Sequence, residues 1–585
     1  MKALLKISIY YFIISILLIY PEVTYSARNT LNMVTAPRSD NASSITNVTF
    51  STAGNWNTAS NWSNSTVPNS DTINITIDAN CTITGSYICN NLIINPSKIL
   101  TIAPGAYLKV NGTLTNNAGT SGLVIQAHSS TSNGSLVFSS PTLNPTIPAS
   151  VQMFSDGYTS YNANSYMWQF FGIPVQSQLV STTFTNVGTS ATRIRQFNES
   201  GTSSTIWTPS TYITGTQTLY AKIGYEIVQP AFATYTFSGN LFTDNGTTFT
   251  VACTNGAPYK GFNILSNPYT ASIDISKLSA SNFGAAFPEV YLYNSGGYNE
   301  WTKKFDSSDP GIPGCYTTSS YNIAGNLGVP SEIPSMQGFV IYTTSATTFT
   351  VPYSALKQQT ERQKVKTVAS MQGVRIEVSG TKQYDKVWLF SSPSFSNSYD
   401  AGYDGQKMMI SNSSQLYVDQ GGVEYQIGAI NNFDAATLKF KVYSNGTYKF
   451  RFYSTNLSGN LYLIDTKLNT STNINNDSTI YSFTGATTDS YTRFKLSTTA
   501  IVTDTKNLSE QSLDIKQSGN SVELSNNSTV NATANIYNLN GTLMKSAKVA
   551  AFANLILSTS DFDQGVYILK FTNNIYSQTK KIIIQ

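Results

Sequence analysis

The chain has 585 residues, more than one hydrophobic core usually organises, so several domains are expected. Charged residues make up 11% of it, against roughly 25% in ordinary soluble domains. The net charge is only +4, and no basic cluster is interleaved with aromatic residues, which argues against nucleic acid as a partner. The abundance of Tyr, Thr, Asn and Gly favours extracellular β-structure.

The first residues have the pattern of a secretory signal peptide. Lys2 and Lys6 flank the start of an apolar run at 7–20, and small residues precede a cleavage site after Ser26. The run is short for a membrane span. We therefore predict a signal peptide at 1–26, a linker at 27–45, and a mature protein that is exported and has no transmembrane segment.

Residues 46–140 carry strand-sized apolar pairs at even intervals. Leu92, Leu100 and Leu108 follow one another at steps of eight residues, with turn dipeptides such as Pro104-Gly105 between them. This spacing predicts a parallel β-solenoid whose rungs stack on one another, with a twisted sandwich as the alternative.

Two tryptophans, Trp56 and Trp62, precede these repeats. Their flat faces could stack on the apolar side of a sugar, which makes them candidate glycan contacts. They could equally cap the open end of the solenoid, and we favour the cap because a solenoid needs a sealed terminus there. The stretch from Gly54-Asn55-Trp56 to Pro68 resembles the N-terminal repeat modules of type IX secretion cargo proteins.

Four cysteines fit an oxidising compartment. Cys81 and Cys89 lie in neighbouring strand-like runs and could form a disulfide, and Cys253 could pair with Cys315, although other pairings remain open. The chain has no C-x-x-C motif and a single histidine, His128, so zinc is not expected.

Residues 141–355 change to longer, antiparallel-looking strands separated by Gly, Asn and Pro turns. Three segments, 168–175, 261–274 and 336–342, resemble in this order an uncharacterised domain that recurs in surface cargo of the type IX pathway. Ser266 stands where that family usually has glycine, which bears on the tightness of the turn that follows.

That turn, Asn267-Pro268-Tyr269, allows two interpretations. In the first it belongs to a site in which Asp274 is a ligand or base. In the second, which we favour, Pro268 fixes the backbone and Tyr269 fills a core.

Residues 356–366 form the most charged stretch and predict a linker or one short helix. From 367 to 502, strand-like runs place Lys or Arg at every second position, so one face is wet and the other packed. This pattern predicts a β-sandwich or jelly roll. A further linker is expected at 503–512.

Asp385, Asp400 and Asp404 are candidate ligands for Ca²⁺, because hard cations take carboxylate oxygens. The loop that holds the last two resembles the Asp-x-x-x-Asp-x-x-Lys loop of the same cargo. It lacks the order of an EF-hand, so we favour a local pair between Asp404 and Lys407 that braces the turn. No other cofactor is indicated.

Residues 513–585 end the chain with β-runs that predict a small sandwich closed by a hairpin. Asn540-Gly541 is a two-residue hairpin signal, and the run from Gly565 is joined to the last run by an Asn-rich turn at 572–574. The sequence features are the turn glycine, a Gly-x-Tyr element and the terminal basic-apolar run, at Gly541, Gly565, Tyr567, Lys580, Lys581, Ile582 and Ile583. They resemble the type A C-terminal sorting domain of type IX (Por) secretion cargo, with Gln585 where a lysine is common.

The resemblance implies an immunoglobulin-like fold for this domain, passage through the outer-membrane sorting machinery, and display on the cell surface. Our first hypothesis is thus an all-β, non-catalytic surface protein, adhesin-like or structural, with an extracellular glycan or surface polysaccharide as a candidate ligand. The alternative is a polysaccharide-degrading glycosidase or lyase with its carboxylates on the solenoid flank. We favour the first, because no nucleophile or metalloprotease motif accompanies His128.

Overall fold

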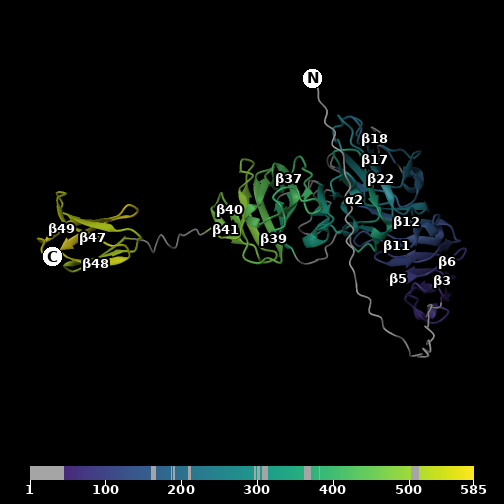
Figure 1. The fold of residues 1–585 in the computed structure, drawn as a ribbon, viewed down its shortest axis with the longest axis horizontal. Coiled ribbons are helices and arrows are strands. Elements are labelled where there is room, and N and C mark those ends of the chain that lie inside the picture. The colour runs from purple at the N-terminus through teal and green to yellow at the C-terminus, as the bar shows by residue number, and fades with distance from the viewer. Residues whose placement is uncertain are drawn as a thin grey trace, which may run out of the picture. The chain divides into compact units, whose positions relative to one another are not determined.

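The computed structural model of the protein describes residues 45–585 apart from 160–165, 186, 189–191, 209–211, 296–297, 300–303, 306–313, 361–370, 381–382 and 502–512. Almost all regular structure in these residues is β-strand, which confirms the all-β prediction (Figure 1). The two α-helices described, α1 (Val180–Thr183) and α2 (Ala280–Phe283), have four residues each. Ser26 and the predicted signal peptide lie outside the described residues.

The first strands form three sheets of parallel pairs, and the chain visits these sheets in turn. Leu92 pairs in register with Leu114, so the chain returns to the same sheet 22 positions later. Leu92, Leu100 and Leu108 therefore lie on three successive sides of one turn. The sheets hold β1 (Thr46–Phe50), β3 (Ile73–Ile77), β6 (Leu92–Ile94) and β9 (Leu114–Asn116); β2 (Gly54–Asn55), β4 (Cys81–Ile83), β7 (Leu100–Ile102), β10 (Leu123–Ile125), β12 (Pro148–Ser155) and the antiparallel β21 (Ala233–Asn240); and β5 (Ser86–Cys89), β8 (Tyr107–Val110) and β11 (Ser135–Phe138).

Apolar side chains of successive turns stack in the interior. Ile75, Leu92 and Leu114 are neighbours in the first sheet, and none is more than 4% exposed. Alternate residues of a strand point to opposite faces, so an in-register stack repeats the same inward positions at every turn. Burial of each such side chain contributes about 1.5–3 kcal/mol.

Trp56 and Trp62 close the beginning of this stack. They are 0% and 2% exposed, and their ring centroids lie 4.7 Å apart. The Trp62 indole donates to the Trp56 carbonyl (2.7 Å) and the Trp56 indole to that of Pro68 (3.2 Å), so both buried N–H groups are satisfied. The backbone N–H of Ser63 donates to Thr49 of β1 (2.9 Å), which covers the free edge of that strand.

This placement supports the cap and corrects the glycan-contact alternative. Sugar stacking needs an indole face in solvent, and neither Trp56 nor Trp62 presents one.

The next part of the chain is built from antiparallel sheets, as predicted. A single apolar cluster runs from Val48 to Ala355, so the change of strand pattern near residue 140 lies within one continuous core. The sheets hold β15 (Gln169–Phe171), β20 (Tyr225–Val228), β17 (Arg193–Phe197) and β18 (Trp207–Thr208); β23 (Phe262–Ser266), β30 (Gly338–Tyr342), β25 (Glu289–Asn294) and β28 (Cys315–Ser320); β29 (Glu332–Ile333), β24 (Ser272–Asp274) and β32 (Leu356–Lys357); and the pairs β13 (Tyr158–Thr159) with β14 (Tyr166–Met167), β16 (Ser177–Leu179) with β19 (Thr218–Tyr220), β22 (Thr247–Val251) with β31 (Thr347–Val351), and β26 (Tyr298–Asn299) with β27 (Lys304–Phe305).

The stretch predicted as a linker or helix at 356–366 begins as a strand. β32 pairs with β24, and the next side chains are also bound: Gln358 donates to the Gly105 carbonyl (2.9 Å) and Gln359 accepts from the N–H of Ser335 (3.2 Å). The helix is therefore wrong for 356–360, because Leu356 and Lys357 complete a sheet and residues 358–360 have no regular structure; residues 361–366 lie outside the described part.

Residues 371–501 form one large and one small sheet around a core of their own. Tyr448, Phe450 and Phe452 are at most 2% exposed and alternate with Lys449 and Arg451, which confirms the predicted two-faced strand. The pair β34 with β37 is parallel, so a purely antiparallel arrangement is wrong. The large sheet holds β38 (Thr437–Lys441), β36 (Gln415–Gln420), β37 (Val423–Ile430), β34 (Gln383–Ser391), β33 (Gln372–Gly380), β39 (Gly446–Thr455), β42 (Ile480–Gly485) and β35 (Gly405–Gln406), and the small one β41 (Thr470–Asn473), β40 (Tyr462–Asp465) and β43 (Phe494–Ser497).

Residues 513–585 form two antiparallel sheets whose facing side chains share one core. The sheets hold β44 (Leu513–Ser518), β45 (Ser521–Asn526) and β48 (Ala553–Ser558), and β47 (Leu543–Val549), β46 (Ala532–Tyr537), β49 (Gly565–Thr572) and β50 (Ser577–Ile584).

Replacing Trp56 by Ala should destabilise the parallel stack by about 3–5 kcal/mol, the usual cost of removing a buried aromatic side chain. Urea denaturation followed by circular dichroism measures the change. Ile93→Ala, at a position 40% exposed on β6, is the control and should cost much less. Equal costs for the two variants would contradict the cap.

Candidate functional site

The closing hairpin is the part of the structure that carries most of the residues expected to form the sorting signal. β49 and β50 pair from Gly565 with Ile584 to Thr572 with Ser577. The Asn573 side chain accepts from the N–H of Tyr576 (2.7 Å), and its backbone N–H donates to the Tyr576 carbonyl (2.9 Å). An Asn-built turn thus fixes the register of the hairpin, as the sequence predicts.

Tyr567 and Ile582 face each other across this hairpin in the interior. Tyr567 is 7% exposed, its hydroxyl donates to the Asp563 carbonyl (3.1 Å), and Ile582 is fully buried. The Lys580 ammonium donates to the carbonyl of Ile515 on β44 (2.8 Å) and so ties the two sheets together. These three side chains therefore support the fold of the domain.

Lys581 and Ile583 point the other way. Both are exposed, Ile583 by 49%, because adjacent residues of a strand lie on opposite faces. The residues expected to form the sorting signal thus fall into two groups. Tyr567, Lys580 and Ile582 stabilise the fold of the domain, whereas Lys581 and Ile583 lie on its surface.

Gly541 lies in the connection between β46 and β47, with a φ of 81° that favours glycine. The predicted hairpin is confirmed, but its two-residue connection is wrong, because residues 538–542 separate the strands. The Asn538 side chain accepts from the N–H groups of Asn540 (3.1 Å) and Thr542 (2.9 Å). These hydrogen bonds form a local turn that accommodates the five residues between the strands.

The Asn267-Pro268-Tyr269 turn is buried. The Asn267 amide donates to three backbone carbonyls, and the Tyr269 hydroxyl donates to Thr247 (2.7 Å) while its ring packs edge-on against Tyr353. Asp274 accepts from Ser276 as the cap of a short 3-10 helix. These contacts agree with the structural interpretation of the turn.

Ser266 stands where the family usually has glycine, and its side chain packs closely against Gly172. A Cβ added at Gly172 would lie 2.1 Å from the Ser266 Cβ, so the space for the serine comes from a glycine on the facing segment.

The three aspartates proposed for calcium do not gather. Asp385 pairs with Lys407 (2.8 Å), the Asp400 carboxylate accepts from Ser396 (2.8 Å), and Asp404 accepts from the N–H of Ala429 (2.6 Å). In the described part of the chain, no three His, Cys, Asp or Glu side chains form a group that could hold a metal ion. The calcium hypothesis is therefore corrected, and the partner of Lys407 is Asp385 instead of Asp404.

No disulfide joins Cys81 to Cys89 or Cys253 to Cys315, all of which are described. Cys81 stacks in register on Leu100 in one sheet, whereas Cys89 stacks on Val110 in another. Both side chains are thus inward members of different stacks, and burial raises the pKa of Cys89 to about 12 and that of Cys81 further. This placement gives no support to the Cys81–Cys89 pairing.

The burial of two carboxylic acids, Glu289 and Asp404, is the main feature that the sequence analysis did not predict. Glu289 accepts from the Tyr291 hydroxyl (2.7 Å) and from the N–H of Gln406 (2.9 Å), which links β25 to the large sheet of residues 371–501. Both carboxyls are fully buried, and burial is the main cause that raises the pKa of each to about 7. Repulsion from Asp404 contributes to the increase at Glu289, and repulsion from Asp400 contributes to the increase at Asp404.

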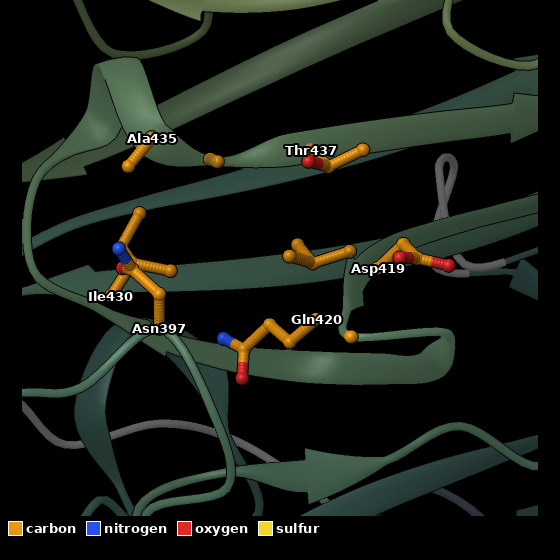
Figure 2. Close-up of a pocket in the computed structure, with 9 residues that line it drawn as sticks. Asn397, Asp419, Gln420, Ile430, Ala435 and Thr437 are labelled. Carbon is orange, nitrogen blue, oxygen red and sulfur yellow. The ribbon is translucent and has the colours of Figure 1, made fainter.

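Near the same sheet, a cavity of about 160 Å³ lies between the ends of β36 and β37 and the start of β38 (Figure 2). Its polar lining comes from Asn397, Asp419, Gln420 and Thr437, and Lys439 neutralises Asp419 (2.8 Å). Ligand pockets commonly measure about 300–1,000 Å³, so we assign this cavity no role.

No helix in the described residues is long and apolar enough to cross a membrane.

Comparisons with known proteins find matches over two parts of the chain. A family model described as "Domain of unknown function (DUF8693)" matches residues 49–498, and one described as "Secretion system C-terminal sorting domain" matches residues 517–585. The second match confirms the predicted sorting domain, and with it a secreted protein of the cell surface.

A curated relative, "Minor fimbrium subunit Mfa5" of Porphyromonas gingivalis, is 27% identical over 497 residues, which are 80% of this chain and 39% of the relative. The chain therefore spans about two fifths of the length of that relative. A solved chain, "Biofilm associated protein - BSP domain", shares 7% identity with a TM-score of 0.12 over 74% of this chain and 62% of its own length, too little to support an argument.

Reducing agents should leave the thermal unfolding of the mature protein unchanged, because no disulfide holds it together. A thiol reagent applied to protein denatured without reductant should label both Cys81 and Cys89. Failure to label these two cysteines would show that they form a disulfide.

The contribution of Glu289 and Asp404 to the free energy of unfolding should fall as the pH rises from about 4.5 to about 7 and then level off. Between these values the folded state holds protons on Glu289 and Asp404 that the unfolded state has released, so a rise in pH favours unfolding. Urea denaturation across this range measures the slope. Glu289→Gln and Asp404→Asn should each flatten it; an unaltered slope in both would contradict the assignment.

Proposed function

Because the chain belongs to the DUF8693 family and ends in a secretion system sorting domain, we propose that it is a non-catalytic surface protein, adhesin-like or structural, exported by the type IX system. The observation that carries the proposal is the sorting domain, which implies contact with the type IX machinery. The likeness to a fimbrium subunit supports a structural role on the surface.

The proposal includes a division into modules. Residues 46–140 would be a β-solenoid, 141–355 a β-rich domain, 367–502 a sandwich and 513–585 an immunoglobulin-like domain, with linkers before and after the sandwich. The three-sided parallel topology and the shared core of the last two sheets support the first and last of these.

An extracellular glycan remains a proposed ligand, but Trp56 and Trp62 are not available to it. Trp168 and Trp207 are half-buried, and the Arg195 guanidinium packs over both rings, at 4.2 and 4.6 Å from their centroids. A glycan array of the mature protein would test this ligand; a flat response would leave the structural role.

The enzyme alternative requires a pair of carboxylates in residues 46–140, and few carboxylates lie there. Residues 46–140 contain two carboxylates, Asp71 and Asp78, and the Asp78 carboxylate accepts from the Asn95 amide (3.0 Å).

Deleting residues 513–585 should keep the protein inside the cell envelope, because the sorting machinery then has nothing to recognise. Surface labelling and fractionation of cells that express the full chain or the truncated chain measure this. A periplasmic pool of folded, signal-cleaved protein is the expected result. Truncated protein on the cell surface in normal amounts would overturn the proposal.

A further inference from the structure

The sheet that contains the closing hairpin has one buried face and one face in solvent, which we call the outer face. Inward positions such as Ile536, Leu569 and Ile582 are fully buried. The outer face is formed by the alternate residues, chiefly Tyr537, Met544, Lys548, Val566, Ile568, Lys570, Lys581 and Ile583.

The strand register places these residues in rows across the sheet. Ile568 lies between Tyr537 on one side and Lys581 on the other, and Val566 lies opposite Ile583. Apolar and basic side chains therefore alternate over one continuous surface. Ile583 and Met544 are 49% and 45% exposed, and this exposure is not explained by the core of the domain.

The charge of this sheet has one sign. Its strands contain five lysines and no aspartate or glutamate. Lys545 and Lys580 donate to the carbonyls of Ser558 (3.0 Å) and Ile515 (2.8 Å), whereas Lys548, Lys570 and Lys581 lie on the outer face. Neighbouring like charges do not stabilise a sheet, so these three ammonium groups are not explained by folding.

The outer edge of the hairpin is already occupied beside Ile583. The Gln517 amide donates to the Ile583 carbonyl (2.5 Å) and accepts from its N–H (3.1 Å). A partner therefore cannot add a strand to β50 at this point, and recognition there must use the side chains of the outer face.

We propose that the outer face is the docking surface of the sorting domain and that its partner is a protein surface of the secretion machinery with carboxylates around an apolar patch. Carboxylates complement Lys548, Lys570 and Lys581, and apolar groups complement the exposed Ile583 and the half-buried Ile568 beside it. The inference rests on the proposed type IX export and adds to it the surface and the chemistry of its partner.

The test is export of the full chain carrying Lys570→Glu and Lys581→Glu. Reversing two charges at a complementary interface should lower the amount at the cell surface by about tenfold or more. Lys516→Glu is the matched control, since Lys516 lies on β44 of the other sheet with its side chain 72% exposed, and it should export normally. Lys570→Arg with Lys581→Arg should also export normally.

Thermal unfolding and protease resistance of each purified chain show whether the sorting domain is folded. If the Glu variant fails to fold, Lys570→Gln with Lys581→Gln gives the same comparison without new charge. A folded variant of either kind that reaches the surface at the wild-type level overturns the docking surface. Normal export of the chain that lacks 513–585 would instead overturn the proposed function.

Binding of the full chain to isolated outer membranes identifies the class of partner. Membranes treated with protease should lose the binding, and the Lys570→Glu, Lys581→Glu chain should bind untreated membranes weakly. Undiminished binding to protease-treated membranes would indicate an anionic lipid and overturn the protein partner.

Discussion

The two-residue period of the β-strand is the constraint on which the rest of this structure depends. Because paired strands keep a fixed register, each inward position is matched by an inward position on its neighbour, and a shift by one residue would reverse every side chain. In the parallel stack this rule places Ile75, Leu92 and Leu114 in one column. In the sorting domain it separates Tyr567 and Ile582, which are buried, from Lys581 and Ile583, which are exposed.

Parts of the chain that are far apart in sequence are joined by buried polar contacts as well as by apolar packing. The main example is Glu289, which accepts hydrogen bonds from its own strand and from Gln406. A carboxyl in such a place is stable in its neutral form, so the attachment of β25 to the large sheet is coupled to protonation. The Trp388 indole, which donates to the Leu327 carbonyl (2.9 Å), makes a contact between the same parts that does not titrate.

Much of this architecture follows from local patterns in the sequence. Alternation predicted the two-faced strands, the Asn-rich turn predicted the closing hairpin, and even spacing predicted parallel rungs, although Leu92, Leu100 and Leu108 proved to mark the sides of one turn. What could not be predicted depends on contacts between distant residues. Lys407 lies three positions from Asp404 but pairs with Asp385, and Cys81 and Cys89 lie close in sequence but belong to different sheets. No local signal marks Glu289 and Asp404 as neighbours, since 115 positions separate them.

The covered ends of the parallel stack determine how its length can vary. At its beginning the free edge of β1 is bound by Ser63, and at its end the Asn144 amide oxygen accepts from the N–H of Leu114 (2.7 Å) while Thr270 accepts from that of Leu136 (3.0 Å). No turn can be added outside these caps without displacing them. A longer or shorter member of the family would therefore gain or lose whole turns between the caps. The turns differ in length, since 17 positions separate Ile75 from Leu92 and 22 separate Leu92 from Leu114.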